Sequence, residues 1–264
     1  MTDRRDPAFT PQAGSPASRI GSRMRTHRPF VVGLTVWAAE LVILAALVVG
    51  FGLLLVNVLL PAGVGRFDTN VANWFVNQRT PTLDDITLIG SNLGSTVVVV
   101  GIAVVACVAL AIAKRWRQVG FLVAAMTLEF IVFLTATLFV DRTRPDVPRL
   151  DSTPPTSSYP SGHTAASVAL WFGLAVVVWS LARSTAVRTI AWILAVALPL
   201  VVGLCRLYRG MHHLTDVTVS LVLGSAAVLC ALLATRSAVA AHAAHDDTTV
   251  ALPQSDSGSL ERAS

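Results

Sequence analysis

Six long apolar runs constrain the fold of this chain more than any other feature. A helix needs about 20 mostly apolar residues to cross the hydrocarbon core of a bilayer. Hydrophobic residues make up 54% of the sequence and charged residues only 13%, about half the charged share of an ordinary soluble domain. We therefore expect an all-α, polytopic membrane protein with a bundle of six transmembrane helices, over residues 31–60, 93–113, 119–140, 164–181, 189–204 and 217–234.

The segments before the first apolar run and after the last one are expected to be tails outside the membrane domain. Residues 1–30 carry six arginines among Pro, Ser, Gly and Thr without an apolar stretch, and residues 236–264 show no periodic pattern. We expect both tails to be disordered and cytosolic, on either side of a six-helix domain over residues 31–235. The first apolar run is too long for the h-region of a signal peptide, so we expect it to remain as an uncleaved span.

The distribution of basic residues indicates the orientation. Six spans put both termini on one side of the membrane, and that side holds 13 of the 20 lysines and arginines, against 7 on the other side. Because cytoplasmic loops are enriched in these residues, we expect a multi-pass protein of the cell membrane with both termini in the cytosol. The polar loops 141–163 and 205–216 then share the extracytoplasmic face.

The net charge of +5 does not indicate a nucleic-acid partner. The basic residues sit in short loops beside apolar runs, where they act as topology signals. The three cysteines lack any spacing typical of a metal site or a disulfide framework, so they predict neither. The expected partner is the lipid bilayer, and the sequence leaves the oligomeric state open.

Two further features leave alternatives open. Between the first two runs, Val71, Trp74 and Phe75 recur at helical spacing, which fits either a short interfacial helix or an ordinary loop with aromatics at headgroup depth. Glu40 and Glu129 lie inside apolar runs, where an unpaired charge is costly. Each is either a functional group or a neutral, hydrogen-bonded packing residue.

A polar, basic island over residues 205–216 separates the last two runs. His212 and Asp216 are four residues apart, so on a helix they share one face. A carboxylate that accepts a hydrogen bond from one ring nitrogen fixes the tautomer and leaves the other nitrogen free as a nucleophile or base. Arg206, six residues before His212, can hold an anion beside it. This pattern is typical of phosphate chemistry at a membrane edge.

A second polar segment precedes the fourth run. Arg144 can clamp two phosphate oxygens. Ser161 is placed to cap the following helix, whose free amides and positive end would point at a bound anion, and Gly162 allows close backbone approach. His163 can then protonate a leaving oxygen. Because both polar segments are expected on one membrane face, they can build one site.

These residues resemble the signature motifs of a known family. The chain is similar, over roughly residues 65–235, to the type 2 phosphatidic acid phosphatases, relatives of the vanadium haloperoxidases and bacterial acid phosphatases. The motifs are Arg144-Pro145, Pro160-Ser161-Gly162-His163, and Arg206 followed by His212 and Asp216.

The resemblance implies the fold and a division of roles. His212 would attack phosphorus to form a phosphohistidine, Asp216 would orient it, and His163 would be the general acid. The phosphate would be cradled by Arg144, Arg206, Ser161 and Gly162.

Two positions depart from the family pattern. The family has a lysine seven residues before the first-motif arginine, and Thr137 stands there instead. Arg142 is a candidate to supply the missing charge to the phosphate. The third motif usually begins with serine, and Cys205 replaces it, a small change in volume.

Simpler structural roles compete with these assignments. Arg149, Arg209 and His213 fit headgroup anchors better than site residues. Asp216 could serve only as a helix-dipole partner. A metal held by His212, His213 and Asp216 is disfavoured, because adjacent histidines point to different faces of a helix and no further ligand has a suitable spacing.

We therefore expect a metal-independent and cofactor-free membrane phosphatase that hydrolyses a lipid phosphate or pyrophosphate at the outer leaflet. Phosphatidic acid, phosphatidylglycerol phosphate and a polyprenyl pyrophosphate all remain candidate substrates. A lipid phosphotransferase on the same fold, or a non-catalytic phospholipid-binding or transport protein, is the alternative.

Overall fold

The computed structural model describes residue 6 and residues 8–152 and 156–250, with side chains up to residue 245. Its regular elements are helices: α1 (Pro16–Arg23), α2 (Pro29–Leu54), a π-helical stretch (Leu55–Val64), α3 (Gly65–Asn77), α4 (Pro81–Asn92), α5 (Thr96–Ile112), α6 (Trp116–Phe139), α7 (Gly162–Leu181), α8 (Thr185–Tyr208) and α9 (Leu214–Val250). The described part of the chain contains no strand, as the all-α prediction requires.

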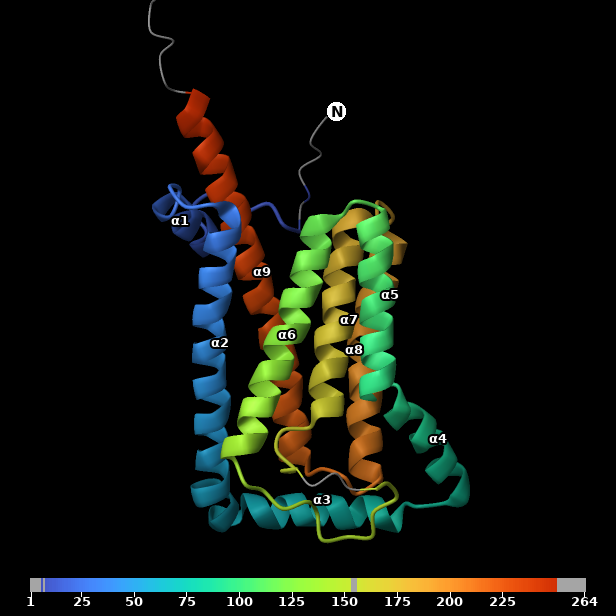
Figure 1. Cartoon of the computed structure of the whole chain (residues 1–264). Coiled ribbons are helices and arrows are strands. Elements are labelled where there is room, and N and C mark those ends of the chain that lie inside the picture. Colours follow the sequence, from blue (N-terminus) through green and yellow to red (C-terminus); the bar gives the residue numbers. More distant parts are fainter. Residues whose placement is uncertain (1–5, 7, 153–155, 251–264) are drawn as a thin grey trace, which may run out of the picture.

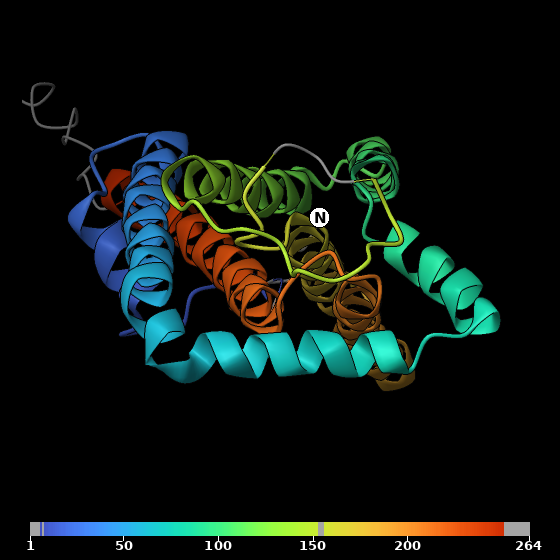
Figure 2. The ribbon, with the colours of Figure 1, turned by 90° about the horizontal axis from the view of Figure 1, so that it is seen from below.

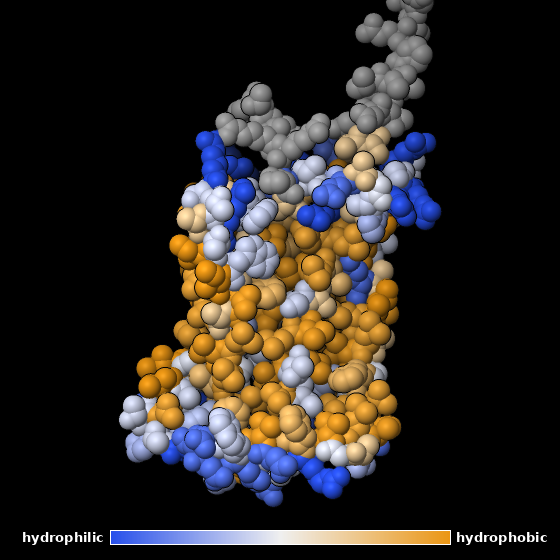
Figure 3. Space-filling model, turned by 180° about the vertical axis from the view of Figure 1, so that it is seen from behind, coloured by the Kyte–Doolittle hydropathy of each residue, from blue (hydrophilic) through white to orange (hydrophobic). Residues whose placement is uncertain are grey.

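Six helices run along a common direction and form the bundle, in agreement with the predicted spans (Figure 1). The helices α2, α6, α7, α8 and α9 are each long and apolar enough to cross a membrane. The sixth, α5, meets this criterion together with α4, to which it is joined at a bend of 41°. The chain is therefore a polytopic membrane protein, and its apolar side chains form a wide band between two polar ends (Figure 3).

An interfacial helix, one of the two alternatives for residues 61–93, is present. The chain turns at Gly63, whose φ of 121° is accessible to glycine, and α3 then lies across the lower end of the bundle (Figures 1 and 2). Helix α4 follows, with the hydroxyl of Thr80 capping its first turn. These two helices bring polar side chains to the same end as the loop before α7 and the turn before α9.

The N-terminal tail, predicted to be disordered, is structured in its described part. Helix α1 begins at the capping residue Ser15 and packs closely on α9, where a Cβ at Gly21 would lie 2.4 Å from the Cβ of Ala240. Phe9 is fully buried and stacks edge-to-face on Phe121 of α6, with ring centroids 5.1 Å apart. A single aromatic residue in a polar segment gave no periodic signal, so the sequence did not reveal this anchor.

The C-terminal tail also differs from the prediction over its first residues. Helix α9 continues past residue 235 to Val250, and Arg236 donates a hydrogen bond to the carbonyl oxygen of Ala8. Alanine-rich sequence favours a helix even without an apolar face, which explains the extension. Residues 251–264 of the predicted tail lie outside the described residues.

Candidate active site

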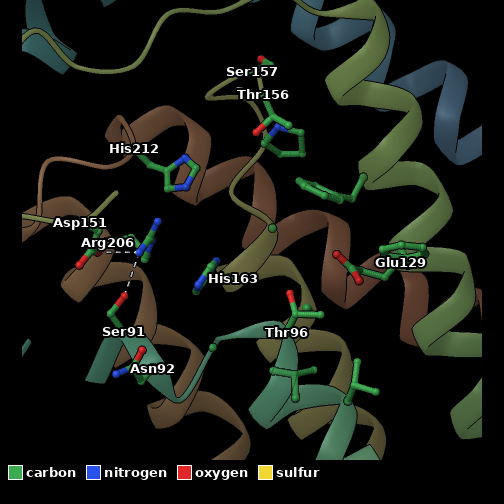
Figure 4. Close-up of a pocket in the computed structure, with 18 of the residues that line it drawn as sticks. Ser91, Asn92, Thr96, Glu129, Asp151, Thr156, Ser157, His163, Arg206 and His212 are labelled. Atoms are coloured by element: carbon green, nitrogen blue, oxygen red, sulfur yellow. Dashed lines mark hydrogen bonds and ion pairs between the residues drawn. The ribbon is translucent and has the colours of Figure 1, made fainter. Parts of the chain in front are cut away.

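A cavity of about 800 Å³ opens at the end of the bundle where α3 lies. Arginines, histidines and an aspartate from both predicted polar segments line one half of it (Figure 4). The other half is lined mainly by apolar side chains of α5 and α6. The two predicted polar segments therefore meet at one site. The residues of the polar half include Arg144, Asp151, His163, Arg206 and His212, together with Ser91 and Asn92 of α4.

The turn between α8 and α9 fixes the position of His212. At the end of α8, the amide of Gly210 bonds to the carbonyl of Leu207 and the amide of Met211 to that of Arg206. This is a Schellman arrangement, in which Gly210 adopts the left-handed conformation at φ 72°. The turn leaves His212 outside both helices, because α9 begins at Leu214.

The imidazole of His212 is held by the backbone and not directly by Asp216. Its Nδ1 lies 2.8 Å from the carbonyl oxygen of Ser158, and 3.9 Å from the nearest carboxylate oxygen of Asp216. The second distance is too long for a hydrogen bond. The expected direct contact between ring and carboxylate is therefore absent, because His212 precedes the helix and the four-residue helical spacing does not apply.

Asp216 acts on the imidazole through Ser158. The Ser158 hydroxyl donates to Asp216 Oδ2 at 2.6 Å, while the carbonyl of the same serine accepts from His212. The amide of His213 also donates to Asp216 Oδ2, at 2.9 Å. The carboxylate thus holds in place the loop whose Ser158 carbonyl accepts the hydrogen bond from the His212 ring.

Arg142, a predicted phosphate ligand, lies in the protein interior and does not line the cavity. Its guanidinium forms ion pairs with Asp216 and, at 2.5 Å, with Asp68 of α3. It also donates to the hydroxyl of Thr215 at 2.7 Å. A buried guanidinium paired with two carboxylates braces α3, α9 and the loop, so the phosphate-binding expectation is wrong for this residue.

Arg144 and Arg206 both face the cavity, from different polar segments. Arg144 donates to the carbonyl of Met211 at 2.7 Å and lies 3.5 Å from Nε2 of His212. Arg206 donates to the hydroxyl of Ser91 at 2.9 Å. The Nε atom of each arginine is buried without a hydrogen-bond partner, as is that of Arg142, so only the place of Arg144 and Arg206 at the cavity sets them apart from Arg142.

Asp151 is a residue of the cavity wall that the sequence did not single out. Its carboxylate bridges Arg206, at 3.0 Å, and Arg209, at 2.6 Å. Burial alone would raise the pKa of Asp151, but its hydrogen bonds with Arg209 and the charges of Arg209 and Arg206 outweigh burial and lower it. Arg209 is buried and bonds to Leu150 and Asp151 of the loop before α7. The prediction that Arg209 anchors the protein at the lipid headgroups is therefore wrong.

The start of α7 brings Gly162 and His163 to the cavity, while Ser161 lies behind it. Ser161 is fully buried and caps α7 without a side-chain bond to the helix backbone. Its amide donates to the hydroxyl of Ser220 at 2.7 Å. The first amides of a helix lack partners within that helix, so those of Gly162 and His163 are placed at the cavity.

Burial keeps the His212 imidazole neutral. Loss of solvent is the main cause that lowers the pKa of His212 well below 6.5, and the charges of Arg206 and Arg144 lower it further. The Ser158 carbonyl can only accept, so Nδ1 carries the proton, and Nε2 keeps a lone pair that faces Nη1 of Arg144 at 3.5 Å. The geometry therefore presents an uncharged imidazole nitrogen beside two cationic groups.

The structure shows where Thr137 and Cys205, the two residues that depart from the family pattern, lie. Thr137 does not line the cavity, and its hydroxyl donates to the carbonyl of Leu134 in its own helix. Cys205 is buried against α4, where a Cβ at Gly90 would lie 2.5 Å from its Sγ. Among the described residues, no three His, Cys, Asp or Glu side chains are grouped to hold a metal ion.

Comparisons with known proteins agree with the motifs. Residues 118–240 match the model of the PAP2 superfamily. The chain is similar to the crystal structure of the first transmembrane PAP2 type phosphatidylglycerolphosphate phosphatase from Bacillus subtilis, with a TM-score of 0.61 and 20% identity, over 77% of this chain and 94% of that chain. It also matches LpxE of Aquifex aeolicus, with a TM-score of 0.49 and 24% identity, over 62% of this chain and 92% of the other.

No curated protein sequence matches the chain. The family match covers the two helix starts and the turn that carry the motifs, and the fold extends the likeness to most of the bundle. Residues 118–240, just under half of the chain, match the PAP2 superfamily, and the chain has the fold of the PAP2 type membrane phosphatase from Bacillus subtilis.

Proposed function

We propose that this protein is a phosphatase that cleaves the phosphate monoester or pyrophosphate of a membrane lipid through a phosphohistidine at His212. One observation carries the proposal: the bond from Nδ1 to the Ser158 carbonyl leaves Nε2 unprotonated, at a cavity that Arg144 and Arg206 also line. A fixed neutral imidazole next to two guanidinium groups is suited to attack a phosphate that those groups neutralise.

The reaction takes two displacements. The Nε2 lone pair of His212 forms a bond to phosphorus while the bond to the leaving oxygen breaks, and His163 donates a proton to that oxygen. His163 then accepts a proton from water as the water oxygen attacks the phosphohistidine. The P–N bond breaks, inorganic phosphate leaves, and both histidines return to their first state.

Arg144 and Arg206 bind the phosphate oxygens in this scheme. Both line the cavity, whose polar half combines their two positive charges with the single carboxylate of Asp151. Charge that builds up on the equatorial oxygens during transfer would be stabilised by these fixed groups. Gly162 and the first amides of α7 complete the cradle, while Ser161 supports it from behind through Ser220.

The apolar half of the cavity supports a lipid substrate. Its walls include Val100 of α5 and Phe130 of α6, which are 49% and 53% exposed. The cavity thus joins a cationic end at headgroup depth to the lipid-facing side. A lipid whose headgroup enters between α5 and α6 would keep its chains in the bilayer.

The proposed orientation has this site at the extracytoplasmic face of the cell membrane. It rests on the distribution of basic residues, because 13 of the 20 lysines and arginines lie on the side of the membrane that carries the termini. Cysteine substitution of exposed Arg149, followed by labelling of intact cells with an impermeant maleimide, tests this orientation: labelling from outside supports it, and labelling only after permeabilisation contradicts it.

The activity itself is tested by phosphate release from phosphatidic acid and from a polyprenyl pyrophosphate. The protein is purified in detergent and assayed in excess chelator, as wild type and as His212→Ala. Turnover by the wild type alone supports the proposal. Equal turnover by both proteins, or turnover that chelator abolishes, contradicts it. No release from either lipid favours a phospholipid-binding protein.

A further inference from the structure

Glu129 is a buried carboxyl that the proposed reaction does not use. It lies on α6, is 2% exposed, and lines the cavity. Figure 4 shows its carboxyl extending from α6 toward the middle of the cavity, on the side that faces Thr96 and His163. The group is therefore aimed at the space that a substrate would fill.

The neighbours of Glu129 on its own helix offer it no partner. Within the described residues, its carboxyl makes no hydrogen bond or ion pair. The neighbouring cavity residues of α6 include Met126, Phe130 and Phe133, which are apolar. The hydroxyl of Thr127 is already bonded to the carbonyl of Val123 at 2.7 Å. An unpartnered carboxyl at such a depth is costly to bury, so it calls for a ligand.

The position of Glu129 along the cavity suggests which part of a substrate it meets. The arginines and histidines that would hold the phosphate occupy the other end, whereas Glu129 stands among the apolar residues that would contact lipid chains. A group at the boundary between a phosphate and acyl chains is the glycerol backbone with its ester carbonyls. A carboxyl that keeps its proton can donate one hydrogen bond to such a carbonyl.

We propose that Glu129 is a specificity-determining residue that donates a hydrogen bond to the ester region of a glycerolipid phosphate. This inference rests on the proposed phosphatase function. The chain of a polyprenyl phosphate has no polar group below its phosphate, and it would leave the Glu129 carboxyl buried and unpaired. The enzyme therefore favours ester-linked glycerolipid phosphates over polyprenyl phosphates and over ether-linked lipids of the same length.

A matched pair of substrates tests this directly. Detergent-purified protein is assayed with dioleoyl phosphatidic acid and with its dialkyl ether analogue, which differs only in lacking the two ester carbonyls. We expect the wild type to prefer the ester in kcat/KM by roughly threefold to tenfold, the range for one hydrogen bond. Glu129→Leu should bring the ratio close to one, and Glu129→Gln, whose amide still donates, should retain the preference.

Glu40 supplies the control. It is a second membrane carboxyl, on α2, with both oxygens buried and unpartnered, but it does not line the cavity. Glu40→Leu should leave the ester-to-ether ratio unchanged. A wild type without preference, or a preference that persists in Glu129→Leu, overturns the inference while the phosphatase proposal stands. Absence of phosphate release from both lipids would remove the phosphatase proposal, and this inference with it.

Discussion

The Nδ1 atom of His212 lies 2.8 Å from the carbonyl oxygen of Ser158, a residue 54 positions earlier in the chain. The nucleophile proposed for this protein is thus oriented by the backbone of the loop that leads into α7. The same serine binds Asp216 through its hydroxyl. A single residue links the carboxylate to the imidazole, which makes the loop before α7 part of the catalytic apparatus in our proposal.

Replacing Arg142 should lower the stability of the protein, whereas replacing Arg206 should weaken the binding of phosphate. Arg142→Ala leaves the buried carboxylates of Asp68 and Asp216 without their common partner, a change that costs about 3–5 kcal/mol. We expect a marked fall in the melting temperature in detergent. Arg206→Ala should keep most of that stability, because Asp151 retains Arg209, and should weaken competitive inhibition by inorganic phosphate or vanadate. If Arg142→Ala is as stable as the wild type but has a raised KM, Arg142 binds the phosphate and the brace assignment is wrong.

The pH profile should reflect the lowered pKa of His212. Only the unprotonated ring is a nucleophile, and a pKa well below 6.5 means that the ring stays unprotonated as the pH falls past 6.5. We expect the fall in kcat/KM that is caused by protonation of His212 to occur below pH 6.5. In Arg206→Gln, loss of a nearby positive charge should move that fall to higher pH.

The substrate phosphate also titrates near this range, with a second pKa of about 6. Its ionisation is common to the wild type and the variant, so the comparison isolates the contribution of the enzyme. An acidic limb that is identical in the two proteins would contradict the assignment of the nucleophile to His212.

Glycine at position 162 should be required by packing at the cavity. A Cβ there would lie 2.9 Å from two ring carbons of Phe133, closer than real side chains approach. Gly162→Ala should destabilise the protein by about 1–3 kcal/mol and lower turnover, because α7 or Phe133 must shift. Gly101→Ala on α5 is the matched control: a Cβ there meets no atom within 4 Å. Equal melting temperatures for the two variants would argue against the close approach.

Asp151 should oppose the binding of phosphate. Its carboxylate occupies Nη1 of Arg206, at 3.0 Å, and adds a negative charge to the wall of the phosphate end. Asp151→Asn keeps the size of the side chain and removes that charge, so inorganic phosphate should inhibit the variant at a severalfold lower concentration. Weaker inhibition in Asp151→Asn would mean that the carboxylate instead holds Arg206 in the binding geometry.

The spans were predictable because the bilayer demands length and apolarity, both of which are local properties of a sequence. The predicted run over residues 119–140 corresponds to α6, at Trp116–Phe139, and the run over 164–181 to α7, at Gly162–Leu181. The N-terminal tail was not predictable in the same way. Phe9 is buried in a cluster with residues of α5, α6, α7 and α9, and this depends on the packed bundle.

The candidate site was predictable as a set of residues, but not in its connections. Arg142 and Arg144 are two residues apart and chemically identical, yet one is a buried brace and the other faces the cavity. The partners of Arg142 stand 74 residues away in each direction, on α3 and α9. The acceptor for His212 is a backbone carbonyl, which every residue carries, so no residue type could mark it.

Glu129 shows where a local rule was informative. A carboxyl in an apolar run indicated either function or hydrogen-bonded packing, and its position in the cavity without a partner favours function. Glu40 raised the same question from the same kind of sequence, but it lies apart from the cavity. Glu129 lies on α6, which borders the cavity at this position, whereas Glu40 lies on α2 and does not line it.

The most direct test of the proposed mechanism is to trap the phosphoenzyme. The wild-type protein is mixed with lipid substrate labelled in its phosphate, quenched in alkali, which preserves phosphohistidine, and digested for mass spectrometry. The account predicts phosphate on the peptide that contains His212, released on later exposure to acid, and no label in His212→Ala. Turnover without any trapped label at that peptide, or continued turnover by His212→Ala, would contradict it.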